Sequence, residues 1–111
     1  MEQERRRTPR YPFIATAEVI DQSSQATVST RVTELSLRGC YLDMPDPLPI
    51  DTRINIKIYS EGKFFESAAM VVYSQPKLGV GVTFLEIRPQ FLSVLKQWLL
   101  AAAVAKYGSK T

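Results

Sequence analysis

The sequence predicts an all-β domain, a six-stranded antiparallel β-barrel that carries a C-terminal α-helix. Three observations predict this class. Short segments with an apolar residue at every second position recur along most of the chain. Clusters of Gly, Pro, Asp and Ser separate these segments. The apolar period lengthens to three and four residues only near the end. The length of 111 residues suits one domain.

The first three strands are expected at residues 11–20, 26–35 and 40–42. In the first, Phe13, Ala15, Ala17 and Val19 alternate with the residues between them. The polar run 21–25 predicts the turn that follows. The second segment is rich in Thr and Val, which favour strands. Gly39 interrupts the pattern before the short third strand.

The remaining three strands are expected at residues 53–58, 64–73 and 80–84. A loop over 44–51 precedes them, because it contains three prolines. Glu61-Gly62 predicts a hairpin turn, and 75–79 predicts another.

The last segment predicts a helix over about 88–107. Pro89 suits a first helical turn and Gly108 a helix end. Leu100 and Val104 fall on the face opposite Trp98 and offer a surface for homodimerisation, although scattered exposed apolar residues are common and need no partner. The residues expected on the Trp98 face, against the barrel, are Phe91, Val94, Leu95, Leu99 and Ala102.

Cysteine and histidine usage argues for a binding module rather than an enzyme. The chain has no histidine and one cysteine, Cys40. This composition excludes an intrachain disulfide, makes a zinc site or other metal cofactor unexpected, and removes the commonest general base. An unpaired thiol suits a reducing compartment. No apolar run approaches the length of a membrane span, and the charged N-terminus is unlike a secretory signal. We therefore expect a cytoplasmic protein.

Positive charge is concentrated at the N-terminus. The net charge is +3, yet Arg5, Arg6, Arg7 and Arg10 fall within six residues. Residues 1–10 therefore predict a flexible basic arm ahead of a barrel domain over 11–111. Such an arm indicates an anionic partner, although a solvated tail has the same composition.

Two short motifs refine this prediction. Arg6 and Arg10 form an R-x-x-x-R pattern just before the first strand. Glu34, Ser36 and Gly39 form an E-x-S-x-x-G pattern at the end of the second strand. Together they resemble the signature motifs of the PilZ domain family, R-x-x-x-R followed by [D/N]-x-S-x-x-G. The resemblance covers essentially the whole chain. It includes Gly39-Cys40-Tyr41-Leu42, the proline-rich loop, the segment 79–84 and the closing helix, and it implies binding of the second messenger cyclic di-GMP.

The chemistry of guanine and phosphate suits these side chains. An arginine fork matches the N7 and O6 acceptors of guanine, and arginine also pairs with phosphate through two parallel bonds. Arg6 and Arg10 would take these groups, with Arg5 and Arg7 as supporting charges. A carboxylate such as Glu34 accepts from the N1–H and N2–H₂ edge of guanine.

Ser36 would donate to the ligand or fix the loop, and Gly39 would permit a positive φ or a close backbone approach. Each residue also has a purely structural interpretation: an exposed strand residue for Glu34, a turn former for Ser36 and a bulge glycine for Gly39.

Two positions depart from the family pattern. Glu34 stands where the family has Asp or Asn, so the carboxylate lies one methylene further out. Misplacing a charge-assisted hydrogen bond costs about 1.5–3 kcal/mol. Arg38 is bulky at a position where small residues are frequent in the PilZ family, and it adds a positive charge near the expected phosphates of the ligand.

Three functions are compatible with these residues. The leading one is a cyclic di-GMP receptor or adaptor that signals to a protein effector by ordering its N-terminal arm over the ligand. The alternative is a degenerate PilZ domain that binds no nucleotide and acts as a protein-interaction adaptor. Binding of DNA or RNA is not expected, because the aromatic residues mostly alternate into the presumed core and the net charge is low.

Overall fold

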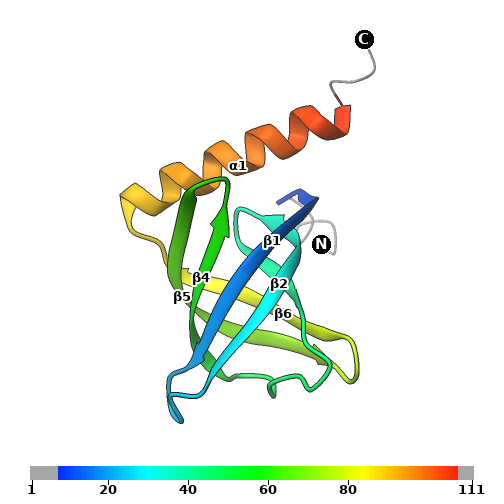
Figure 1. Cartoon of the computed structure of the whole chain (residues 1–111), viewed down its shortest axis with the longest axis vertical. Helices are drawn as coiled ribbons and strands as arrows, with labels where there is room; N and C mark the ends of the chain where they lie inside the picture. The colour runs from blue at the N-terminus through cyan, green and yellow to red at the C-terminus, as the bar shows by residue number, and fades with distance from the viewer. Residues whose placement is uncertain (1–7, 108–111) are drawn as a thin grey trace, which may run out of the picture.

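The computed structural model describes residues 8–107, which form a six-stranded barrel and one helix (Figure 1). This architecture confirms the predicted fold class. Each expected strand is present, with boundaries within two residues of the prediction. The elements are β1 (Arg10–Asp21), β2 (Thr27–Ser36), β3 (Gly39–Asp43), β4 (Arg53–Ser60), β5 (Lys63–Gln75), β6 (Gly79–Glu86) and α1 (Pro89–Tyr107).

The barrel closes in the order β1-β2-β3-β6-β5-β4, and every neighbouring pair is antiparallel. β1 begins at Arg10, which pairs with Ser36 of β2. Arg10 therefore belongs to the barrel, although it was expected to be the last residue of the N-terminal arm. The β4–β5 hairpin turns through Glu61 and Gly62, whose φ angles of 51° and 79° are those that a two-residue type I′ turn requires. Gly108, the expected helix end, lies outside the described residues.

Alternation along the strands builds the core. The isoleucines of β4 at 54, 56 and 58 are at most 1% exposed, and the polar residues between them face outward. Phe65 and Phe84 pack together, with ring centroids 4.8 Å apart. The other buried apolar side chains of the strands include Ala17, Val19, Val32, Leu35, Leu42, Ala69, Val71, Val80 and Val82.

The expectation that most aromatic residues lie in the core was wrong. Among the aromatic side chains that the structure describes, only Phe65, Phe84 and Trp98 are buried. Tyr59 and Phe64 are directly opposite on β4 and β5 and pack on the outer face of the barrel, with centroids 6.4 Å apart.

α1 lies across one end of the barrel (Figure 1). Leu95 and Trp98 are buried there, and Trp98 packs against Phe13 of β1 at 5.4 Å between ring centroids. Leu100 and Val104 face outward, 67% and 59% exposed, as the helical pattern predicted. Within residues 8–107, no helix has both the length and the apolar character that a membrane span requires.

Register shifts interrupt three of the strand pairs. They fall between Pro12 and Ala15 on β1 and between Val32 and Glu34 on β2. Two more lie in the β5–β6 pair: between Val71 and Tyr73 the extra residue is on β5, whereas opposite Ala68 and Ala69 it is Leu85 of β6. An extra residue in one strand reverses the alternation beyond it and re-aims the following side chains. These shifts therefore decide which side chains reach the outer wall of the barrel.

Candidate functional site

The predicted motif residues gather around one depression on the outer wall of the barrel. Its volume is about 590 Å³. It is lined from β1, β2, β3, β5 and β6, so five of the six strands contribute. Its lining includes Thr8, Arg10, Glu34, Ser36, Arg38, Gly39, Tyr41, Val72, Tyr73, Gly81 and Thr83.

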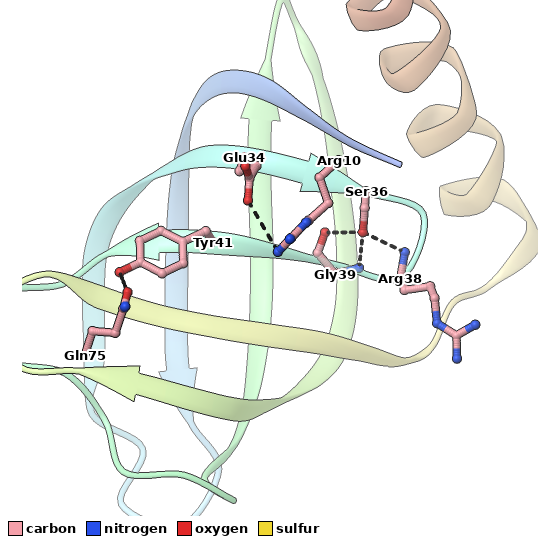
Figure 2. A network of polar contacts seen from close by, with 7 residues as sticks. All are labelled: Arg10, Glu34, Ser36, Arg38, Gly39, Tyr41 and Gln75. Carbon is pink, nitrogen blue, oxygen red and sulfur yellow. Dashed lines mark hydrogen bonds and ion pairs between the residues drawn. The ribbon is translucent and has the colours of Figure 1, made fainter. Parts of the chain in front are cut away.

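Arg10 and Glu34 form an ion pair at this depression. Their Nη1 and Oε1 atoms are 3.8 Å apart, and Figure 2 shows the two side chains directed toward each other from β1 and β2. The side chains are 48% and 43% exposed. An exposed pair of this kind contributes at most about 1 kcal/mol. The free-energy cost of breaking this ion pair, so that either side chain can contact a ligand, is therefore small.

Ser36 locks the turn between β2 and β3. Its hydroxyl accepts hydrogen bonds from the backbone N–H groups of Arg38 and Gly39, both at 3.1 Å, and donates to the Gly39 carbonyl at 3.2 Å (Figure 2). One donor and two lone pairs are all that a hydroxyl offers. The side chain is buried. The sequence suggested two roles for Ser36, contact with the ligand or fixing of the loop, and the hydrogen bonds of the structure correspond to the second.

Gly39 permits a close backbone approach and not a positive φ. Of the described glycines, Gly62 is the one with a positive φ. A Cβ atom added to Gly39 would lie 1.9 Å from the Val82 carbonyl oxygen of β6. The carbonyl of Arg38 accepts from the backbone N–H of Phe84 at 2.8 Å and from the Thr83 hydroxyl at 3.2 Å. The turn that carries the second motif is therefore fixed to β6.

Two tyrosines that sequence reasoning missed also line the depression. Tyr41 and Tyr73 have ring centroids 6.0 Å apart, and the Tyr41 hydroxyl donates to Gln75 Oε1 at 2.6 Å. Desolvation raises the pKa of Tyr41, with smaller contributions from Tyr73 and Asp43. Tyr41 faces outward on the short β3, between buried Cys40 and buried Leu42. This alternation is the sequence signal that could have placed Tyr41 on the outer wall.

Other parts of the predicted site are not placed. Arg5, Arg6 and Arg7 lie outside the described residues, so the structure does not test whether they join Arg10 at the depression. Across residues 8–107, no group of three or more His, Cys, Asp or Glu side chains is arranged to hold a metal ion.

Comparison with known families decides the relationship. A family model described as the PilZ domain matches residues 4–101. The chain belongs to the PilZ domain family. No curated protein matches the sequence.

Solved PilZ structures share the fold. The PilZ domain with c-di-GMP of YcgR from Escherichia coli is 17% identical with a TM-score of 0.74, over 96% of this chain and 99% of that one. The PilZ domain of CeSA from a cellulose-synthesizing bacterium is 20% identical with a TM-score of 0.65, over 83% and 96%. The Bacillus subtilis inhibitor of motility is 16% identical with a TM-score of 0.73, over 92% and 53%. At these identities the likeness establishes the fold.

Proposed function

We propose that this PilZ domain binds cyclic di-GMP at the depression on its outer wall. The observation that carries the proposal is the convergence of Arg10, Glu34 and the Ser36–Gly39 turn around one site. Membership in the PilZ family supports it, and one solved relative, the YcgR domain, is described with c-di-GMP.

The polar end of the site suits one guanine and its phosphate. The Arg10 guanidinium offers the planar fork that matches guanine N7 and O6, or a phosphate, through two parallel bonds. Glu34, on the adjacent strand, offers a carboxylate to the guanine N1–H and N2–H₂ groups. Both side chains are about half exposed, so the ligand exchanges one ion pair for two charge-assisted contacts.

The N-terminal arm completes the proposed mechanism. Arg5 and Arg6 would close over the bound ligand and order the arm against the barrel, and the new composite surface would recruit a protein effector. No proton transfer or covalent step is required of the protein, so it acts as a receptor and not as an enzyme. We also propose a cytoplasmic location, in keeping with the single buried thiol of Cys40.

Isothermal titration with cyclic di-GMP, GMP and cyclic di-AMP tests the proposal. The wild-type chain is expected to bind cyclic di-GMP with preference over the other two nucleotides. Arg10→Ala should weaken binding roughly 5- to 150-fold, the equivalent of one bidentate contact worth about 1–3 kcal/mol. Arg31→Ala is the matched control, because Arg31 is also exposed and ion-paired, to Asp43, but does not line the depression. Absence of heat from the wild-type chain, or equal loss in both variants, would refute the proposal.

A second function is favoured by the Arg10–Glu34 ion pair itself. A glutamate in place of the family's Asp or Asn reaches the arginine and occupies it without ligand. In that case the domain is an adaptor that binds no nucleotide, and the exposed Leu100 and Val104 of α1 are its contact surface, in a homodimer or with another protein. Light scattering together with a melting curve at saturating cyclic di-GMP separates the two functions. A stable homodimer or hetero-complex whose melting temperature does not respond to the nucleotide would support the adaptor.

A further inference from the structure

A row of outward-facing residues crosses four strands beneath the depression. Glu34 of β2 pairs with Tyr41 of β3, Tyr41 pairs with Gly81 of β6, and Gly81 pairs with Tyr73 of β5. Neighbouring strands lie about 4.8 Å apart, so the row extends about 14 Å from carboxylate to far ring. The acidic and aromatic ends of the row are therefore far enough apart to contact different parts of a ligand with two bases.

Tyr73 reaches this row because of a register shift in β5. Phe65, Ser67, Ala69 and Val71 are buried in alternation, and continuing that alternation would bury residue 73 as well. The shift between Val71 and Tyr73 inserts one residue, so Val72 and Tyr73 are both exposed. Such shifts are common beside functional sites, where they re-aim a side chain.

Two contacts fix where the Tyr73 ring lies. A Cβ atom added to Gly81 would lie 2.1 Å from Tyr73 Cε1 and 2.5 Å from Cζ, so the ring occupies the space that any other residue at 81 would fill. The Tyr41 ring lies beside it at 6.0 Å, and Gln75 holds the Tyr41 hydroxyl. The ring is 37% exposed although it is held in this way.

We propose that Tyr73 stacks on a purine of the ligand, and that Gly81 is the positioning residue that seats its ring. The inference rests on the proposed function and deepens it. Arg10 and Glu34 recognise the edge of one base, whereas Tyr73 contacts the face of the other base about three strands away. Stacking on an aromatic ring adds affinity with little base discrimination, because every base has a π-face. Base specificity therefore belongs to the polar end of the row and binding strength is shared with the aromatic end.

Titration of cyclic di-GMP into Tyr73 variants tests the stacking role. Tyr73→Ala should weaken binding roughly 5- to 150-fold, and Tyr73→Phe should retain the wild-type affinity because the ring is kept. Tyr59→Ala is the matched control. Tyr59 is 38% exposed and also contacts a second ring, Phe64, but it does not line the depression. This control should change the affinity less than twofold.

Gly81→Ala tests the positioning role without removing the ring. The added methyl displaces the Tyr73 ring, so we expect an affinity close to that of Tyr73→Ala. In the Tyr73→Ala background the same substitution should cost nothing further, because no ring remains to be displaced. Equal losses in both backgrounds would show that Gly81 acts through the barrel and would overturn its assigned role. Melting temperatures of all variants report whether the barrel is intact.

The outcomes separate this inference from the function on which it rests. A wild-type chain that gives no heat with cyclic di-GMP would overturn both. A wild-type chain that binds, with Tyr73→Ala no weaker than Tyr59→Ala, would overturn the stacking role alone and leave the receptor function standing.

Discussion

Replacing Ser36 with alanine separates a loop-fixing hydroxyl from a ligand-contacting one. The substitution removes two hydrogen bonds that the hydroxyl accepts, from Arg38 and Gly39, and the one that it donates. The Gly39 N–H group is buried and loses its partner, which costs about 1–3 kcal/mol. The Arg38 N–H group is partly buried and can be hydrated, so its loss costs about 0.5–1.5 kcal/mol. The sum is about 1.5–4.5 kcal/mol, a fall in melting temperature of about 6–18 °C for a domain of this size.

Thermal unfolding followed by circular dichroism measures this effect, with Ser67→Ala as the matched control. Both serines are 7% exposed. Ser67 only donates, to the carbonyl groups of Ala68 and Glu86, and leaves no buried N–H group behind. Its loss should cost about 1 kcal/mol, or about 4 °C. If Ser36→Ala melts no lower than Ser67→Ala, the loop-fixing role assigned to the hydroxyl is wrong.

Three further predictions follow from single contacts. Gly39→Ala should lower the melting temperature by more than about 10 °C, because the added Cβ atom would lie 1.9 Å from the Val82 carbonyl oxygen and force β3 away from β6. A melting temperature close to that of the wild type would contradict this prediction. Cys40 should resist iodoacetamide until the domain unfolds, since burial raises the pKa of its thiol; labelling of the folded protein, detected by mass spectrometry, would count against it. The pKa of Asp21 is lowered, first by the Ser23 backbone N–H and then by the Ser23 hydroxyl. Its stabilising contribution should be complete above the unfolded pKa of about 3.9 and be lost as the pH falls through the lower folded value, so acid titration of Asp21→Asn should show a shallower loss there.

Alternation of apolar residues was sufficient to predict the barrel. The isoleucines of β4 follow a strict period of two and are all buried. Glu61-Gly62 defined its hairpin through turn chemistry alone. The helix was predicted because its period differs from that of every strand, and its buried Trp98 and exposed Leu100 lie on the faces expected.

The candidate site was predicted only in part, because strand register is not a local property. The two motifs identified residues that line one depression in the structure, namely Arg10, Glu34, Ser36 and Gly39. Tyr73 was missed since a register shift places it outside, and no periodicity in its own strand signals that shift. The requirement for glycine at 39 likewise depends on β6, which lies more than 40 residues further along the chain.

Amide chemical-shift mapping of ¹⁵N-labelled protein with cyclic di-GMP tests the central claim most directly. We expect the nucleotide to perturb the amides of Arg10, Glu34, Arg38 and Gly39, and to leave those of β4 unchanged. A spectrum unaffected by saturating nucleotide, or perturbations confined to β4, would contradict the account.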